Sequence, residues 1–592
     1  MSFGRASIAI ALLLVAPKVG GAPPAPGSAA AAPTKAAGPR TFANPLNLDY
    51  RFALDAPGRR EAADPVIVLF GDDYYLFASK SGGYWRSRDL VDWTLIVPQG
   101  LPIEAYAPAV MAYGGALYYS ACDVGLYRSR DPGGGKWEHV GDPFKAGDPD
   151  LFADDDDRVY LYYGLSYNGA ISGQELDPAA GFKKKGAPFV CFRADYAHHG
   201  WERRGEDNLG AVADGQFSEG PWIEGAWMTK HRGTYYLQYA APGTEFKAYA
   251  DGVYTSTSPR GPFAYAPSNP FSAKPTGFIG GAGHSATFAD KQGRYWHVAT
   301  MTISVKHMFE RRLGLFPVTF DDDGTMHADT ALGDYPQVAP ALRAEIARAP
   351  RASNRAGSML LSYGKKTSAS SSLEGLGPER ATDEDVKTYW SARTAGTGEW
   401  LAIDLGTSCR IDAVQVNFGE HEATQRGRDA GAWRQYRVDG SPDGTSWQPL
   451  ADRSSATCDL PHDYLELGTP AQARSVRVVN VHTPGGGTFA VRDLRVFGAC
   501  AGASAPAVAP RFEAHRDASD ARNAVVRWDL VPHAEGYLIR YGAAPGKLYR
   551  NREIRGQREI TLHDLDAGAP VFLTIDAFNE AGVTVGTEVS KI

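Results

Sequence analysis

Residues 45 to 340 repeat one pattern of polar and apolar positions, in which a Gly/Asp turn precedes a strand rich in aromatic residues. The five copies are FGDDYYLFAS from Phe70, YGGALYYSAC from Tyr113, DDDDRVYLYYG from Asp154, KHRGTYYLQYA from Lys230 and DKQGRYWHVAT from Asp290. A further short strand and turn follow each copy, and such spacing favours an all-β fold. A unit that recurs about every 40 to 70 residues predicts a β-propeller. Five copies predict five blades around a central channel, in a domain at residues 41–345.

After residue 357 the pattern changes to alternating strands without the aromatic repeat. The stretches IDAVQVNFGE, RSVRVVNVH and VRDLRVFG predict an antiparallel sandwich over residues 358–500. The stretches AVVRWDLVPHAEGYLIRYG and PVFLTIDAFNEAGVT predict a second sandwich over residues 506–592. The predicted fold class is therefore all-β, with a five-bladed β-propeller followed by two β-sandwich domains.

Composition and charge narrow the range of partners. Of the 592 residues, 11% are aromatic, with 12 Trp and 29 Tyr, which suits β-structure and also the stacking of sugar rings. The net charge is −7, so no basic excess marks a nucleic-acid-binding surface, and we expect no nucleic acid partner. The five cysteines include no Cys/His cluster typical of zinc, and their odd number leaves at least one unpaired within the chain.

The N-terminus has the pattern of a targeting segment. A basic residue precedes an apolar run from Ala6 to Ala16, so residues 1–22 are predicted to be a signal peptide, with an N-terminal anchor as the alternative. Residues 23–40 are predicted to be a Pro/Ala-rich linker. No other long apolar run follows, so we expect no membrane span in the mature protein and a secreted or periplasmic location.

The innermost strand of each blade lines the channel of a propeller, and here that strand precedes each aromatic repeat. It contains Asp64 in blade one, Tyr106 in blade two, Asp148 and Asp150 in blade three, Glu224 in blade four and His284 in blade five. Carboxylates therefore converge on one end of the channel from three blades. Asp64 and Asp148 each precede a proline, which favours an extended backbone at both positions.

Glu224 has neighbours that a solvated surface glutamate does not need. It lies between Trp222 and Trp227, just before a strand. A carboxyl group among apolar rings has its charged form disfavoured and its pKa raised. A general acid that keeps its proton near neutral pH requires such a pKa.

This order of motifs resembles glycoside hydrolase family 43, a five-bladed propeller with DP-type aspartates in blades one and three. The family also has an EG-type glutamate in blade four and a glycine-flanked histidine in blade five. The matching residues are Asp64 in ADP, Asp148 in GDP, Glu224 in EGA and His284 in GAGH. The resemblance implies inversion, with Asp64 as general base, Glu224 as general acid and Asp148 holding the acid and tuning its pKa. It implies no cofactor for the chemistry.

Three further positions follow from the resemblance, each with an alternative. His284 is expected to help hold a water cluster or a structural calcium ion, and a hydrogen-bonded core histidine is the alternative. Arg311, in FERRLGLFPVTF, resembles a family arginine that reaches the active site, and Arg312 is its alternative. Glu219, in SEGPW, is the alternative to Glu224, although Glu224 has the usual spacing before the turn of the next strand.

Several side chains are candidates for sugar binding. The segment from Cys191 to Trp222 is too long for a blade turn, and long ordered loops are usually functional. Indole rings can stack on a sugar face, with packing in the core as the alternative. The candidates are Trp85, Tyr106, His199, Trp201, Glu202 and Trp222.

The two C-terminal sandwiches also resemble known modules. The run ATDEDVKTYWSA, followed by GEWLAIDLG, resembles the discoidin, or coagulation factor type C, module. Several modules of that kind bind sugars and carry a structural calcium ion. Residues 506–592 resemble a fibronectin type III domain, with Trp528 in its core. Because none of the proposed acid/base residues lies in these modules, we expect them to act as binding modules or spacers.

The features together predict an exported, inverting, exo-acting glycoside hydrolase. It would be a monomer that releases arabinofuranose, xylose or galactose-type units from plant cell-wall polysaccharide. One alternative is an invertase-like fructan-acting enzyme, but this chain has AADPVI, AGDPDL and IEGAW where that family shows NDPN, RDP and EC motifs. The other is a non-catalytic carbohydrate-binding propeller, which would not need an intact trio of acids.

Overall fold

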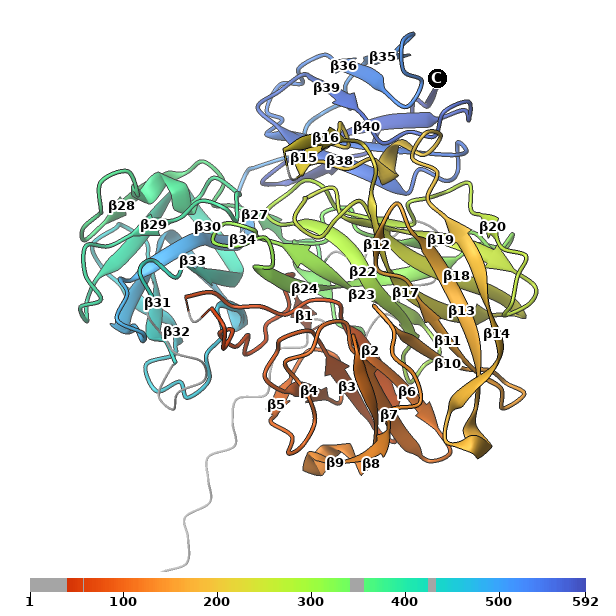
Figure 1. Ribbon diagram of the computed structural model, residues 1–592. Coiled ribbons are helices and arrows are strands. Elements are labelled where there is room, and N and C mark those ends of the chain that lie inside the picture. Colours follow the sequence, from red (N-terminus) through yellow and green to blue (C-terminus); the bar gives the residue numbers. More distant parts are fainter. Residues whose placement is uncertain (1–39, 57, 214, 341–355, 424–432) are drawn as a thin grey trace, which may run out of the picture. The chain divides into compact units, whose positions relative to one another are not determined.

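The structure is a computed structural model that describes residues 40–56, 58–213, 215–340, 356–423 and 433–592. The predicted signal peptide, and the predicted linker up to residue 39, lie outside the described residues. Within these ranges the chain forms strands and short 3-10 turns, and no α-helix occurs (Figure 1). No helix in this part of the chain is long and apolar enough to cross a membrane. The predicted all-β class is confirmed.

Five antiparallel sheets form the blades of the predicted propeller (Figure 1). Blade one contains β2 (Val66–Phe70), β3 (Asp73–Phe77), β4 (Tyr84–Ser87) and β5 (Thr94–Ile96). Blade two contains β6 (Ala109–Tyr113), β7 (Ala116–Ala121), β8 (Val124–Asp131) and β9 (Lys136–Gly141). Blade three contains β10 (Asp150–Ala153), β11 (Val159–Tyr163), β13 (Ala170–Asp177) and β14 (Lys183–Arg193).

The last two blades complete the ring. Blade four contains β17 (Trp222–His231), β18 (Thr234–Ala241), β19 (Ala250–Ser256) and β20 (Ala264–Tyr265), with β12 (Ser166–Tyr167) beside β17 and β21 (Ser272–Ala273) beside β19. Blade five contains β22 (Gly280–Ala289), β23 (Tyr295–Thr302), β24 (Arg311–Phe320) and β25 (Met326–Ala328). The innermost strands neighbour one another in the closed order β2, β6, β10, β17, β22 and again β2.

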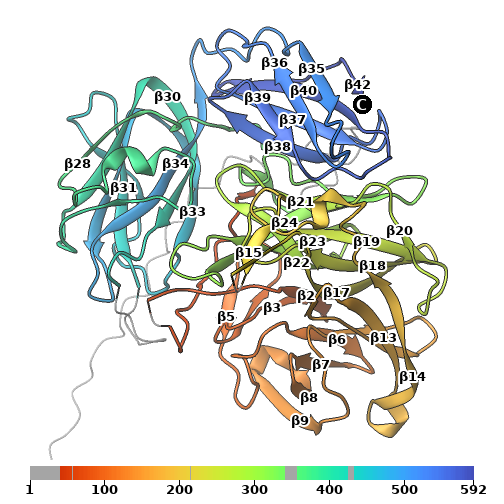
Figure 2. The same cartoon turned by 45° about the horizontal axis from the view of Figure 1, so that its top comes forward.

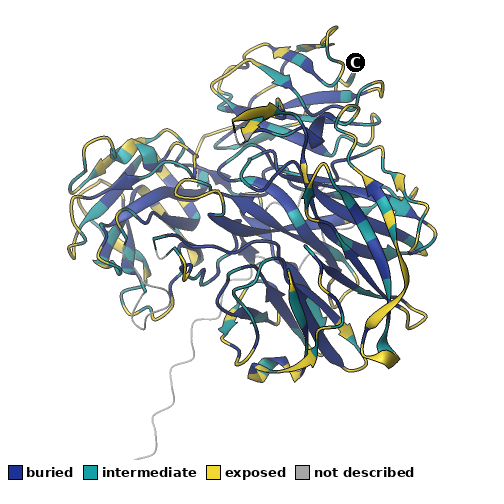
Figure 3. Cartoon of the chain, viewed as in Figure 1, coloured by how far each residue is buried: buried dark blue, intermediate teal, exposed yellow. Residues whose placement is uncertain are grey.

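The aromatic repeat found in the sequence is the second strand of every blade, namely β3, β7, β11, β18 and β23. Its large side chains are buried, as Figure 3 shows for the interior of the blades. Two short strands join the ends of the domain: β1 (Thr41–Phe42) pairs antiparallel with β26 (Gln337–Val338). The long segment between blades three and four contains a separate hairpin of β15 (Ala211–Ala213) and β16 (Gln216–Ser218).

The middle module contains one eight-stranded antiparallel sheet arrangement with its own hydrophobic core. Its strands are β27 (Met359–Leu360), β28 (Lys366–Ala369), β29 (Trp390–Ser391), β30 (Trp400–Phe418), β31 (Gln435–Ser441), β32 (Gln448–Asp452), β33 (His462–His482) and β34 (Ala490–Cys500). A disulfide joins Cys409 to Cys500, between neighbouring strands β30 and β34. Cys122, Cys191 and Cys458 are free thiols.

The last module packs two sheets over a core that includes Trp528 (Figure 2). One sheet contains β35 (Phe512–Arg516), β36 (Ala524–Trp528) and β39 (Glu559–Leu562). The other contains β37 (Gly536–Gly542), β38 (Arg550–Arg555), β40 (Phe572–Asn579), β41 (Gly582–Thr584) and β42 (Ser590–Lys591). The chain therefore has the predicted propeller followed by two sandwiches, and we call residues 512–591 the C-terminal sandwich.

Candidate active site

Three carboxyl groups and one histidine gather at the inner strands. Asp64 and Asp148 lie just before β2 and β10, while Glu224 and His284 lie within β17 and β22. The backbone φ is +52° at Asp64, +46° at Asp148 and +39° at His284. The extended backbone expected before the two prolines is therefore wrong, because both aspartates take the left-handed region, which Asp tolerates better than most residues. Such uncommon conformations cluster at functional sites.

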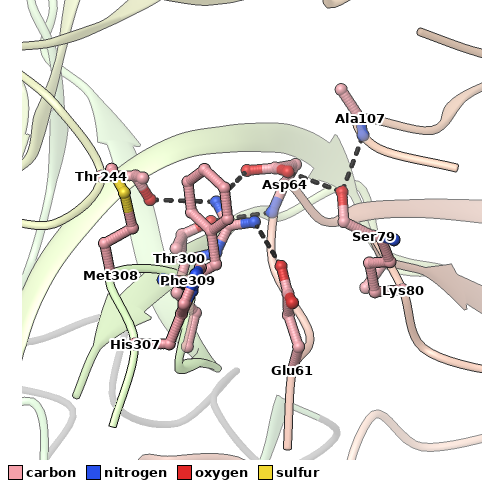
Figure 4. Close-up of polar contacts among 12 residues, drawn as sticks. Glu61, Asp64, Ser79, Lys80, Ala107, Thr244, Thr300, His307, Met308 and Phe309 are labelled. Carbon is pink, nitrogen blue, oxygen red and sulfur yellow. Dashed lines mark hydrogen bonds and ion pairs between the residues drawn. The ribbon is translucent and has the colours of Figure 1, made fainter. Parts of the chain in front are cut away.

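The Asp64 carboxylate is surrounded by hydrogen-bond donors (Figure 4). Ser79 Oγ donates to Oδ2 at 2.6 Å and Arg311 Nη1 donates to Oδ1 at 3.2 Å, while Thr300 Oγ1 accepts from the Asp64 N–H. Burial by itself raises the pKa of the Asp64 carboxyl, but Arg311, His284 and Ser79 together outweigh burial and lower the pKa below its ordinary value. Asp64 is therefore ionised at neutral pH, which is the state a general base needs.

His284 bridges the two aspartates. Its Nδ1 is 3.2 Å from Asp64 Oδ1 and 3.6 Å from Asp148 Oδ2. The free thiol of Cys122 donates to Asp148 Oδ1 at 3.0 Å. Burial raises the pKa of Asp148, and although His284 lowers it, the negative charge of Asp64 raises it further, so the net direction is upward.

Glu224 is the carboxyl group that keeps its proton. Burial raises its pKa well above the ordinary value, and the negative charge of Asp148 raises it further, whereas a hydrogen bond donated by the Tyr249 hydroxyl to Oε1 lowers it. The next residue must be glycine, since a Cβ on Gly225 would lie 2.9 Å from the His284 ring and its φ is +68°. This packing explains why an EG pair marks the acid.

The alternative acid, Glu219, lies elsewhere. Its carboxylate is 33% exposed and pairs with Arg203 at 3.5 Å and with Arg522 of the C-terminal sandwich at 3.4 Å. It contacts none of the channel carboxylates in the hydrogen bonds and ion pairs of the described residues. The geometry therefore favours Glu224 as the acid.

The two consecutive arginines face opposite ways. Arg311 Nη2 donates to Glu61 at 2.9 Å and its Nη1 donates to Thr244 at 3.0 Å as well as to Asp64 (Figure 4). Arg312 instead donates through Nε to His462 of the middle module at 2.9 Å. Because neighbouring strand residues point to opposite faces, only Arg311 can serve the site.

Two of the predicted sugar-binding residues lie at the site or beside it. The half-buried Tyr106 ring packs against Phe309 with 5.6 Å between ring centroids, and the Arg311 guanidinium is 5.9 Å from the Tyr106 centroid. Burial raises the pKa of Tyr106 to about 12, so its hydroxyl stays protonated. Trp222 is 37% exposed and lies two residues before Glu224 on the same strand.

Trp85 and Trp201 do not face the channel, so the prediction that they bind sugar is not supported by the structure. Each is 1% exposed and packed in a hydrophobic core. Trp85 packs against Tyr50, and Trp201 Nε1 donates to Tyr265 at 2.9 Å. In both cases the alternative of core packing holds, because a fully buried ring has no face left for a ligand.

His199 and Glu202 anchor the long segment instead of lining a pocket. His199 Nδ1 lies 2.9 Å from Asp566 of the C-terminal sandwich, and its ring stacks on Tyr265. Glu202 is buried and accepts from the Tyr239 hydroxyl. Both were expected to shape the sugar pocket. Their contacts instead pack the long segment against blade four and the C-terminal sandwich.

Sequence reasoning missed the residues that contact the three acids or Arg311. They are Glu61, Ser79, Cys122, Thr244, Tyr249, Thr300 and Phe309. Glu61 precedes Asp64 by three residues, and its charge was a signal that could have been used. Ser79 and Tyr249 reach their partners within one blade, whereas the others meet the site only when different blades come together.

From the resemblance, His284 was expected to help hold either a water cluster or a structural calcium ion, with a hydrogen-bonded core histidine as the alternative. Calcium takes six to eight oxygen ligands. Within the described ranges no three His, Cys, Asp or Glu side chains are arranged to hold a metal ion. The carboxylates nearest to His284 are the two aspartates of the site, and Asp64 already has Arg311 as its cation. These residues do not fit a protein cage for calcium, and no step is derived through one.

An ionised carboxylate and a protonated carboxyl group in one channel can act as the base and the acid in the hydrolysis of a glycosidic bond. The comparisons agree: residues 58–326 match Glycosyl hydrolases family 43, and residues 366–493 match the F5/8 type C domain. Residues 58–326 are therefore similar to family 43 glycosyl hydrolases, and residues 366–493 are similar to F5/8 type C domains. No such match supports the fibronectin type III resemblance, which stays a prediction.

Two curated relatives and one solved structure illustrate the similarity. The beta-D-galactofuranosidase xynD of Aspergillus niger is 26% identical over 245 residues, which cover 35% of this chain and 64% of that protein. A xylan 1,3-beta-xylosidase of a Vibrio species is 27% identical over 249 residues, which cover 35% and 41%. A thermostable family-43 glycoside hydrolase aligns at 24% identity and a TM-score of 0.41, over 51% of this chain and 99% of that one. The chain thus spans less than two thirds of either curated relative.

Proposed function

We propose that the protein is an exported, inverting, exo-acting glycoside hydrolase that removes single sugar units from plant cell-wall polysaccharide. The observation that carries the proposal is the opposite protonation of two carboxyl groups at one channel end. The pKa of Asp64 is lowered and that of Glu224 is raised, so one is a base and the other an acid at the same pH. Paired titratable groups with pKa values pushed apart mark the acid and base assignments.

The reaction follows from these two states. Asp64 removes a proton from a water molecule, whose oxygen attacks the anomeric carbon from the face opposite to the leaving group. Glu224 gives its proton to the glycosidic oxygen as the bond to the anomeric carbon breaks. The new C–O bond replaces the old one, so the configuration inverts. The cycle closes when Asp64 releases to solvent the proton that it took from water and Glu224 takes up a proton from solvent.

The neighbouring residues support these roles. Asp148 keeps the proton on Glu224 through its negative charge, and His284 holds Asp148 and Asp64 at a fixed separation. Arg311 stabilises the ionised base. Tyr249 holds the acid side chain by a hydrogen bond and limits how far its pKa rises.

The names of the relatives suggest which sugars to test. One relative is a galactofuranosidase and the other a xylosidase, so we propose that the released unit is arabinofuranose, xylose or a galactose-type sugar. The F5/8 type C module and the aromatic composition fit a polysaccharide substrate. We propose that the protein acts as a secreted or periplasmic monomer.

The test compares Glu224→Gln with Glu219→Gln, a matched control that changes a carboxylate five residues away. Purified variants are assayed on nitrophenyl glycosides of the three sugars and on arabinan, xylan and galactan. A general acid typically contributes about 10²–10⁴-fold to the rate, so Glu224→Gln should lose activity by that factor and Glu219→Gln should lose little. NMR of the first product should show inverted configuration. Retained configuration, or an equal loss in both variants, would overturn the assignment.

A further inference from the structure

The exposed aromatic side chains of this protein gather in one place. In the part of the chain that the structure describes, only three aromatic residues are exposed: Tyr167 (44%), Phe217 (67%) and Trp222 (37%). They come from two short segments, residues 165–169 and 209–222, which also expose Leu165, Leu209 and Val212. A contiguous exposed apolar patch on a soluble protein marks an interaction site.

Backbone pairing brings Tyr167 and Trp222 together, and one hydrogen bond joins Tyr167 to the hairpin that carries Phe217. Tyr167 lies directly opposite Trp222 in the pairing of β12 with β17. Residues that are directly opposite in an antiparallel pair have neighbouring side chains on one face. The Tyr167 hydroxyl also bonds to Ser218, the residue next to Phe217. Figure 3 shows the β15–β16 hairpin that carries Phe217 in the exposed colour.

The patch borders the acid side of the active site. Trp222 and Glu224 are two residues apart in β17, so their side chains leave the strand on the same face. Leu165 lies against Gly147, where a Cβ would be 2.8 Å from the Leu165 Cβ, and Gly147 immediately precedes Asp148. The exposed rings thus continue outward from the two carboxyl groups that hold and donate the catalytic proton.

The acid side of a glycosidase is the side of the leaving group, because the acid protonates the oxygen that departs. We propose that Tyr167, Phe217 and Trp222 form an aglycone platform, which stacks on the sugar rings that remain on the polymer after the terminal unit is released. This inference rests on the proposed function and extends it. It assigns to the enzyme a substrate in which the released unit is attached to at least two further sugar rings.

Charge favours a neutral glycan over other occupants. Residues 165–169 and 209–222 contain no Lys or Arg. The two acidic residues of these segments are Asp214 and Glu219, and the carboxylate of Glu219 is paired with Arg203 and Arg522. The side chains beside the rings, Asn168, Gln216 and Ser218, are uncharged hydrogen-bonding groups. Aromatic faces combined with neutral donors and acceptors match the apolar faces and hydroxyl groups of a sugar chain.

The test separates the platform from the catalytic centre. Wild type, Trp222→Ala, Tyr167→Ala and Phe217→Ala are compared on two substrates of the sugar that wild type releases best. One is an oligosaccharide of three or more units, and the other is the glycosyl fluoride, which has no aglycone ring. Loss of one aromatic contact typically weakens an interaction about two- to tenfold. We therefore expect the ratio of kcat/KM for oligosaccharide over fluoride to fall about two- to tenfold in each platform variant.

The control is Leu530→Ala, which truncates an equally exposed apolar side chain of the C-terminal sandwich and should leave the ratio unchanged. An unchanged ratio in all three platform variants would overturn the platform.

A second experiment measures binding without turnover. In affinity electrophoresis, Glu224→Gln protein should be retarded by soluble arabinoxylan, arabinan or galactan, and adding Phe217→Ala should reduce the retardation. If wild type hydrolyses none of the substrates but is retarded, the proposed function is wrong and the platform stands. If wild type is a dimer that dissociates in Phe217→Ala, and the retardation is unchanged, the patch binds a second copy of this chain and the platform is refuted.

Discussion

Glu420 of the middle module is buried among arginines, and its removal should be costly. Its carboxylate lies 2.7 Å from Arg60 Nε and 3.6 Å from Arg434, with Arg492 at 3.9 Å, and both Glu420 and Arg60 have 0% exposed side chains. Burial raises the pKa of Glu420 by itself, but the surrounding arginines outweigh burial and hold the pKa far below its ordinary value. The glutamate is therefore an anion that several cations share.

The size of the effect follows from this burial. Glu420→Gln keeps the shape but removes the charge, which leaves the arginines buried without a full counter-ion. Breaking a buried ion pair by removing one partner costs about 3–5 kcal/mol. The exposed pair of Arg474 with Asp404, in the same module, joins Nε to Oδ1 at 2.9 Å, with side chains 47% and 34% exposed. Asp404→Asn is the matched control and should cost at most about 1 kcal/mol.

Urea unfolding at pH 7, followed by tryptophan fluorescence, gives the free energy of unfolding of wild type and of each variant. If several transitions occur, the comparison uses the first one that shifts in either variant. The expected result is a loss for Glu420→Gln that is at least three times the loss for Asp404→Asn. The sign of the pH dependence provides a second check. Because the folded pKa of Glu420 is depressed, its stabilisation is present above the unfolded pKa of about 4.3 and is lost as the pH falls below that value. The gap between wild type and Glu420→Gln should therefore narrow from pH 5 to pH 3. Equal losses in the two variants, or a gap that does not depend on pH, would refute the reasoning.

Two further predictions concern the alkaline limb of the pH–activity profile, where Glu224 loses its proton. Asp148→Asn removes a negative charge that raises the pKa of Glu224, so the alkaline limb of kcat/KM should move to lower pH, and a limb that stays in place would contradict the tuning role. Tyr249→Phe removes a hydrogen bond that lowers the same pKa, so the limb should move to higher pH. Both shifts are measured with a nitrophenyl glycoside between pH 4 and 9, and shifts of the same sign would show that the limb does not report Glu224.

The architecture was predictable because its signals are local and repeated. Turn residues followed by alternating aromatic residues recur in β3, β7, β11, β18 and β23, and each copy specifies the same strand. The carboxylates at the inner strands were predictable because each lies shortly before a copy of the repeat, in a motif that resembles those of family 43. Cysteine pairing was not predictable, because Cys409 and Cys500 are 91 residues apart and meet only through β30 and β34.

The indole rings show where sequence reasoning stops. A tryptophan that stacks on sugar and one that fills a core have the same side chain, and neighbouring residues do not separate them. Trp85 and Trp201 are buried by strands of their own domain, whereas Trp222 stays exposed beside the acid. Tyr249 was missed because it lies in the connection before β19 and contacts Glu224 only once blade four is folded.

The active site and the module interface share the same two pieces of backbone. Glu61 and Arg311 turn inward and bond to each other, and Arg311 holds the base. Their neighbours Arg60 and Arg312 turn outward, to Glu420 and His462 of the middle module. The middle module therefore fixes the outer side of the segments that present the inner charges. A change that loosens this interface therefore acts on Arg60 and Arg312, the chain neighbours of the two residues that hold the charges of the site.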